Sequence, residues 1–169
     1  MLSRIMIVTA SVLVLIGLAT ASGTAKTKTV HDGVDRSAAV DIRRVKVGYA
    51  KRVVHARVFS VLSSDQPICV AMLYGKPKAR VHYSARGCIS ITGHRSKRLL
   101  KVTPHGSKRI RCRGMRVRWR QNTEGMITKV TVPRRCSKRM GRHRSQFKIF
   151  SYSGGNPSDH TGRFKVRRG

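Results

Sequence analysis

Acidic residues are scarce in this sequence, which holds 6 Asp and Glu against 37 Lys and Arg among 169 residues. Hydrolysis by paired carboxylates needs two acids that face one site, but the six acids are dispersed and fall mostly in stretches typical of turns. Aromatic residues make up only 5% of the chain, at core-like positions rather than in a row on which bases could stack. The composition argues against a carboxylate-dependent hydrolase and against an aromatic nucleic-acid platform.

Catalytic and metal-binding motifs are also missing. The chain has no CxxC pair, no closely spaced histidine pair and no GxSxG sequence, so zinc-type ligand sets and a serine nucleophile elbow lack support. We expect a non-enzymatic protein with no metal, no cofactor and no small-molecule substrate. Two alternatives remain: a secreted hydrolase with an unrecognised site, and a Ca²⁺ site at Asp32, Asp35 and Asp41. Ordinary hydrogen bonding in turns would explain the same three acids.

A sustained helical period of 3.6 residues is absent after the N-terminal segment, and short alternating runs take its place. Their spacing predicts an all-β fold, namely a single antiparallel β-sandwich domain of about eight or nine short strands. A phase slip at Arg43-Arg44 predicts a β-bulge. The predicted strands cover 40–49, 52–62, 68–74, 79–83, 88–92, 99–102, 115–120, 126–132 and 146–152. Residues 153–159 are predicted to be a loop, and the basic tail 162–169 is a candidate edge strand.

The stretch from Arg111 to Cys136 gives the clearest local signal. Met115, Val117 and Trp119 alternate with arginines, which predicts a half-buried strand. A polar loop of about five residues, 121–125, would join it to a second strand that ends at Pro133. We therefore expect a long hairpin in which Trp119 is a core anchor near the cysteines.

The N-terminal segment predicts export. An apolar run follows Arg4 and ends in Ala19-Thr20-Ala21, which is typical of a cleaved signal peptide. A membrane anchor is the alternative, but the run is shorter than the roughly 20 residues of a membrane-spanning helix. The expected organisation is a signal peptide at 1–21, a flexible leader at 22–29 and a β-sandwich domain at 30–169. We expect a secreted, extracellular or envelope-associated monomer.

Four cysteines in an exported chain predict two disulfides, for which three pairings are possible. Cys69 and Cys88 bracket one hairpin-like stretch, and Cys112 and Cys136 bracket the other. Sequential pairing, Cys69–Cys88 and Cys112–Cys136, is therefore the expected arrangement.

Framework motifs carry a resemblance to a known group of proteins. They are Asp32 and Asp35 followed by Asp41-Ile-Arg-Arg-Val-Lys-Val47, the run from Arg52 to Phe59, and the segments RCxGMRVRW and VPRRC. Together they resemble small secreted β-sandwich proteins of actinobacteria that have no assigned function. The resemblance covers most of the mature chain and implies the fold and export, but it brings no catalytic residues.

Basic residues give the strongest functional signal, because the formal net charge is +31. Strand alternation would set Arg116, Arg118 and Arg120 in a row about 7 Å apart, and arginine favours bidentate phosphate contacts. A solvated, solubilising face is the simpler interpretation.

The predicted polyanion-binding residues are Arg116, Arg118, Arg120, Arg134, Arg135, Lys138 and Arg139. Expected partners are anionic cell-envelope polymers or phospholipid head groups. Extracellular nucleic acid, bound non-specifically, and an antimicrobial role are the alternatives.

Overall fold

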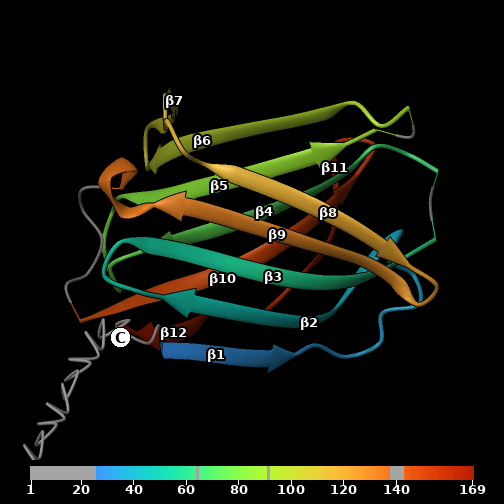
Figure 1. The fold of residues 1–169 in the computed structure, drawn as a ribbon, viewed down its shortest axis with the longest axis horizontal. Helices are drawn as coiled ribbons and strands as arrows, with labels where there is room; N and C mark the ends of the chain where they lie inside the picture. Colours follow the sequence, from blue (N-terminus) through green and yellow to red (C-terminus); the bar gives the residue numbers. More distant parts are fainter. Residues whose placement is uncertain (1–25, 64, 91, 138–142) are drawn as a thin grey trace, which may run out of the picture.

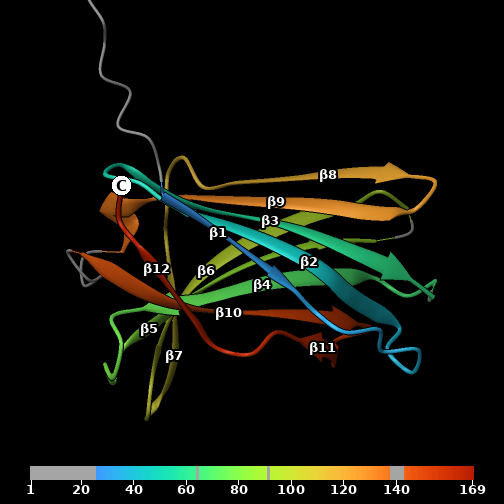
Figure 2. The same cartoon turned by 90° about the horizontal axis from the view of Figure 1, so that it is seen from below.

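Two antiparallel sheets lie face to face in the computed structural model, which describes residues 26–63, 65–90, 92–137 and 143–169 (Figures 1 and 2). Sheet A contains, in spatial order, β1 (Lys26–His31), β2 (Val40–Tyr49), β3 (Val53–Leu62), β9 (Gly125–Pro133) and β8 (Arg116–Asn122). Sheet B contains β11 (Asn156–His160), β10 (Arg144–Ser153), β4 (Ile68–Gly75), β5 (His82–Ile89), β6 (Arg95–Thr103) and β7 (Gly106–Ile110), and β12 (Phe164–Arg167) also pairs with β10. The predicted antiparallel β-sandwich is confirmed.

Alternating side chains from both sheets form the core. On β3, Val54, Ala56 and Val58 are fully buried, and the residues between them face outward, as the two-residue period of a strand requires. Central strand β4 is buried on both faces along most of its length, which explains why its sequence is almost continuously apolar. The described segments include no helix with the length and apolarity that a membrane crossing needs.

Both predicted disulfides are present. Cys69 on β4 lies directly opposite Cys88 on β5. Cys112 lies in the segment that crosses from β7 to β8, and its partner Cys136 ends a short 3₁₀ helix, η1 (Arg134–Cys136). The second disulfide therefore ties together two connections at the same end of the sandwich.

The described chain contains twelve strands rather than eight or nine. Strands β1, β7 and β11 were not predicted because their side chains are mostly polar and exposed. The expected leader overlaps β1, which starts at Lys26. Residues 79–83 and 88–92 were predicted as separate strands, but β5 runs unbroken from His82 to Ile89. The predicted bulge appears as a register shift between Ile42 and Arg44, and the basic tail forms β12. The predicted signal peptide, 1–21, lies outside the described residues.

The β8–β9 hairpin differs from the expectation in two respects. Asn122 pairs with Gly125, so the turn contains two residues instead of five. Trp119 is half-buried and packs with Val40, Ile68 and Met126 in a small second cluster, whereas the Cys112–Cys136 disulfide packs against the main core. Trp119 faces inward as predicted, but its predicted position near this disulfide was wrong, because Trp119 lies in the middle of edge strand β8 and packs in the separate small cluster.

Candidate functional site

Four basic side chains form a line across the outer face of sheet A. Arg118 on β8 pairs with Lys129 on β9, Lys129 pairs with Arg57 on β3, and Arg57 pairs with Lys46 on β2. All four side chains are exposed. We name this line the basic ladder. Since neighbouring strands are about 4.8 Å apart, the ladder spans about 14 Å perpendicular to the strands.

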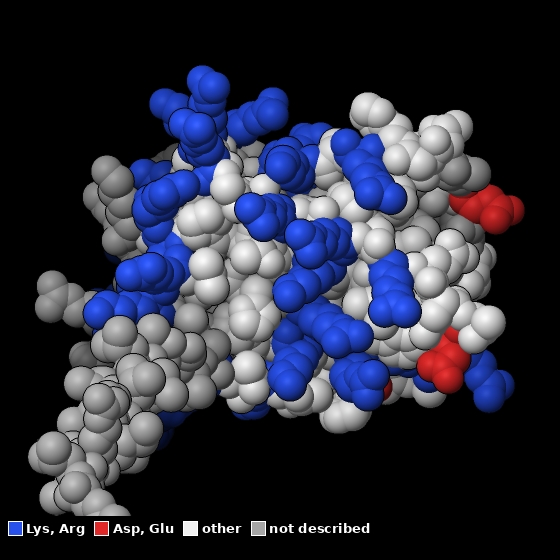
Figure 3. All heavy atoms as spheres, in the orientation of Figure 1, with Lys and Arg blue, Asp and Glu red and all other residues white. Residues whose placement is uncertain are grey.

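The rows on either side of the basic ladder differ in charge. On one side, Arg120, Ile127, Phe59 and Arg44 occupy equivalent register positions, and the guanidinium of Arg44 lies 5.9 Å from the Phe59 ring centroid. On the other side, the corresponding row is Arg116, Thr131, His55 and Gly48, in which only the edge-strand residue is a lysine or arginine. Figure 3 shows the resulting band of Lys and Arg side chains on this face.

Like charges lie directly opposite one another at three consecutive positions of the basic ladder. Like-charged cross-strand pairs destabilise a sheet. Each pair costs on the order of 0.2–1 kcal/mol, the magnitude by which favourable pairs stabilise one. Among the described residues, no ion pair or hydrogen bond engages the charged group of Lys46, Arg57, Arg118 or Lys129. The fold therefore holds a row of uncompensated cations, and an anion laid along the row would remove the repulsion.

His55 lies in the row beside the ladder that also contains Arg116. Partial burial lowers the pKa of its imidazole below the usual 6.5, and the nearby charges of Lys129 and Lys46 lower it further. The ring covers Gly48 of β2 so closely that a Cβ at this position would collide with the imidazole. A side chain at position 48 would therefore force the His55 ring to move, and the lowered pKa favours the neutral imidazole.

The six acids lie at one end of the sandwich, together with the β1–β2, β3–β4, β8–β9 and β10–β11 connections, and Figure 3 shows the acids of this face toward that end. Several of them serve the fold. Asp41 is buried and pairs with Arg43 at 2.6 Å, Asp35 accepts a hydrogen bond from the Ser37 hydroxyl, and Asp159 accepts one from the backbone N–H of Ile42. The opposite end of the described molecule holds no acid, so the charge distribution is strongly polarised.

These placements form no metal cluster among the described residues, although the acids near Asp32 affect one another: burial, and then the charges of Asp159 and Asp41, raise the pKa of Asp32. Within the described ranges, no group of three or more His, Cys, Asp or Glu side chains could hold a metal ion. The contacts of Asp35 and Asp41 match the turn and strand hydrogen bonding that the sequence also allowed.

No protein-family model matches this chain, and no curated protein matches it.

The structure divides the sequence-predicted binding residues between two places. Arg116, Arg118 and Arg120 are exposed on the outer face of sheet A, as the alternation predicted. Arg134 and Arg135 do not join them, because after Pro133 the chain turns into η1 at the end of the sandwich. Arg134 donates to the Lys51 carbonyl at 3.1 Å and lies over the Tyr49 ring, and Arg135 donates to the Arg113 carbonyl at 3.2 Å. Lys138 and Arg139 lie outside the described residues.

Three members of the basic ladder were missed by sequence reasoning. Lys46, Arg57 and Lys129 each lie between two inward-facing residues of their strands, β2, β3 and β9. Alternation predicts that each faces outward, but a lone outward lysine or arginine is common on any sheet. The register between strands far apart in sequence brings them into line.

Proposed function

We propose that this protein is a secreted, non-enzymatic protein that binds linear anionic polymers of the cell envelope along the basic ladder. The observation that carries the proposal is the register, which aligns Arg118, Lys129, Arg57 and Lys46 across four strands. The formal net charge of +31 supports it, since a field of one sign concentrates polyanions near the surface and speeds their association.

A line of cations matches a linear polymer better than a flat array of lipid head groups. The ladder row holds four cations, whereas the row on one side holds two, Arg120 and Arg44, and the row on the other side holds one, Arg116. Arginines at the ladder can grip phosphate or carboxylate in a bidentate manner, whereas lysines act as point charges. Binding through such contacts is electrostatic, independent of monomer sequence and sensitive to salt.

The proposal is tested with duplex DNA as a calibrated probe, because its salt dependence reports the number of phosphate contacts. If the four ladder residues make the contacts, the logarithm of the binding constant should fall with the logarithm of salt at a slope of about −3.6. Changing Lys46, Arg57 and Lys129 to Ser should reduce that slope by about 2.7 units. The slope is measured by fluorescence anisotropy over a salt series.

The matched control removes three positive charges elsewhere. Lys76, Lys78 and Arg80 are exposed in the β4–β5 connection, and their change to Ser should leave the slope nearly unaltered. Equal losses in both triple variants would mean that diffuse charge alone drives binding, and the ladder would be abandoned as a site.

Competition experiments identify the class of anionic partner, because each candidate partner is tested for its ability to displace the DNA probe. Anionic polymer isolated from the cell envelope should displace the DNA probe from the wild-type protein, and vesicles of anionic phospholipid should displace it less well at equal charge. Stronger displacement by vesicles would replace the linear polymer with a membrane surface as the partner. Failure of the envelope polymer to displace DNA would favour nucleic acid.

A further inference from the structure

A second group of cations surrounds the segment that crosses from β7 to β8. A depression of about 540 Å³ lies on one side of this segment, and its cationic lining residues are Lys101, Arg111, Arg113 and Arg135. A second depression of about 500 Å³ lies on the other side of the segment, and its cationic lining residues are Lys97, Arg98, Arg109 and Arg111. Arg111 is thus shared by both depressions. We name the residues Lys101, Arg111, Arg113 and Arg135 the crossover cluster.

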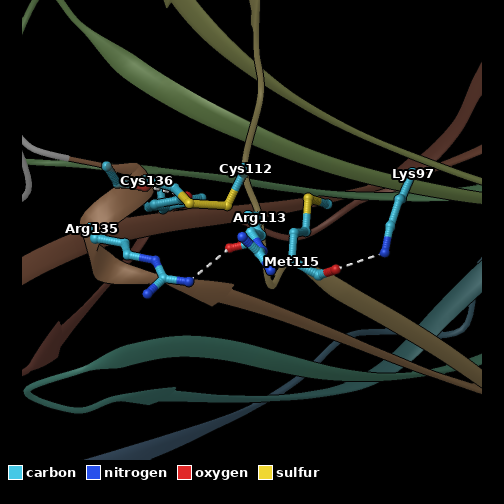
Figure 4. The surroundings of a disulfide bond; sticks show 8 residues. Lys97, Cys112, Arg113, Met115, Arg135 and Cys136 are labelled. Atoms are coloured by element: carbon cyan, nitrogen blue, oxygen red, sulfur yellow. Dashed lines mark hydrogen bonds between the residues drawn. A yellow bond between two sulfur atoms is a disulfide. The ribbon is translucent and has the colours of Figure 1, made fainter.

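The crossover cluster is held in place by covalent and hydrogen bonds (Figure 4). The Cys112–Cys136 disulfide joins the crossing segment to η1, and Arg135 donates to the Arg113 carbonyl at 3.2 Å. On the other side, the Lys97 ammonium donates to the Met115 carbonyl at 2.8 Å. Arg111 and Arg113 therefore project from a braced segment, Lys101 from β6 and Arg135 from η1, so that none of them lies on a free loop, which lowers the entropy lost when an anion binds.

Repulsion at the crossover cluster resembles that at the basic ladder. Lys101 on β6 lies directly opposite Lys108 on β7, so another like-charged pair faces across neighbouring strands. Tyr83 and Ile110 also line the larger depression, so its cations surround partly apolar walls, where attraction to an anion is screened less than in open water.

The two basic surfaces are separate and face different directions. On the side of the ladder nearer the β2–β3 turn, the next row contains the uncharged residues Thr131 and Gly48, His55, and one arginine, Arg116 on edge strand β8. Figure 3 shows uncharged surface between the central band of cations and the cations at the left end. Figure 2 shows the crossing segment running along that end, from the level of sheet B to sheet A, whereas the ladder faces outward from sheet A. A short polymer segment lying on the ladder would leave the crossover cluster open.

We propose that the crossover cluster is a second polyanion-binding surface and that the protein uses both surfaces to bridge separate polymer chains. This inference rests on the proposed function of the basic ladder and adds cross-linking to it. Two independent surfaces on one rigid domain hold two polymers at a fixed separation, and multivalent attachment along each polymer strengthens the network.

The number of short oligonucleotides that one protein molecule binds distinguishes a protein with two binding surfaces from a protein with one. A labelled single-stranded oligonucleotide of about four nucleotides matches the four cations of the ladder and lies at the lower end of the site sizes of single binding domains. The wild-type protein should bind two such probes, measured by titration at concentrations above the dissociation constant. The ladder variant, with Lys46, Arg57 and Lys129 changed to Ser, should bind one. The crossover variant, with Lys101, Arg111 and Arg113 changed to Ser, should also bind one.

Bridging is measured by light scattering with long duplex DNA. The wild-type protein and the Lys76, Lys78 and Arg80 control should cross-link the DNA, and both site variants should bind it without cross-linking. Circular dichroism melting checks that each variant is folded, and sedimentation without DNA checks for self-association, which would supply a second site by another route.

The outcomes distinguish this inference from the proposed function. If the wild-type protein binds one oligonucleotide, or the crossover variant still cross-links DNA, bridging through the crossover cluster is overturned while ladder binding stands. If the ladder variant binds as well as the wild-type protein, the proposed function fails, and the bridging inference fails with it.

Discussion

The outer faces of the two sheets use the same types of residue in different ways. On sheet B, Arg86 lies 4.5 Å from the Tyr152 ring centroid and donates to the Cys69 sulfur at 3.3 Å. Lys148 on the same face lies 4.7 Å from the Phe150 ring centroid. On sheet A, by contrast, the ladder cations face one another across the strands without a compensating partner in the described molecule.

This contrast shows that the number of charges on a face does not define a binding surface. A cation that lies over an aromatic ring contributes to stability through the ring's electron-rich face, and an external anion would have to compete with that contact. A cation opposite another cation loses stability in the free protein and regains it when an anion binds. The basic ladder is therefore suited to binding, whereas the ring contacts of Arg86 and Lys148 on sheet B help to hold the strands together, even though Arg86 also lies opposite Arg98 of β6.

Removing the Cys69–Cys88 disulfide should give the largest loss of stability of the changes considered. It should lower the free energy of unfolding without changing the affinity for DNA. The bridge lies on sheet B and joins residues 19 apart in sequence, so changing both cysteines to Ala should cost about 3 kcal/mol of unfolding free energy. Urea unfolding measures the loss. Affinity for duplex DNA at a temperature where the variant is folded should not change, and a parallel loss of affinity would contradict the division of roles between the faces.

The same substitution on the two faces should change stability in opposite directions. Lys129 faces like charges on both neighbouring strands, so Lys129→Thr should stabilise the free protein by about 1 kcal/mol at low salt. Lys148→Thr removes the contact with Phe150 and should destabilise by about 0.5–1 kcal/mol. Thermal melting at low and high salt measures both.

The salt concentration provides the control for the comparison of Lys129→Thr with Lys148→Thr. Screening should abolish most of the gain from Lys129→Thr, because repulsion between exposed charges weakens as the Debye length shortens. Destabilisation by Lys129→Thr at low salt would show that the ladder is not under electrostatic strain.

The smallest expected effect is a pH dependence that originates at His55. Folding lowers the pKa of this imidazole through burial and the nearby Lys129 and Lys46, so the unfolded chain binds a proton more readily than the folded protein. The stability associated with His55 is therefore complete above the usual pKa of 6.5 and is lost as pH falls through the lowered value. Between pH 7 and pH 5, the wild-type protein should lose more stability than His55→Gln, as measured by urea unfolding.

Polyanion binding should reduce this pH dependence. An anion on the adjacent ladder neutralises Lys129 and Lys46, which raises the pKa of His55 toward its usual value and favours the protonated form. The difference between the wild-type protein and His55→Gln should therefore shrink in saturating DNA. An unchanged difference would place the bound polymer away from the ladder.

Local patterns predicted much of the fold because they depend on neighbouring residues. Alternation from Met115 to Arg120 correctly placed the arginines of β8 outside, and the cysteine positions gave the correct pairing. The same reasoning failed at β11, where Asn156 and Pro157 are typical of a loop but pair with Ser153 and Tyr152 of β10. Sheet pairing can stabilise a strand whose own residues do not favour one.

The sequence by itself determined the excess of positive charge, the antiparallel strands and the outward direction of most strand lysines and arginines, because composition and alternation are local properties. Tertiary structure decided which of these cations meet. Lys46, Arg57 and Lys129 come from strands separated by up to about eighty residues, and the register between the strands places them in one row. Tertiary structure also carried Arg135 away from Arg118 to the other surface, because η1 turns the chain after Pro133.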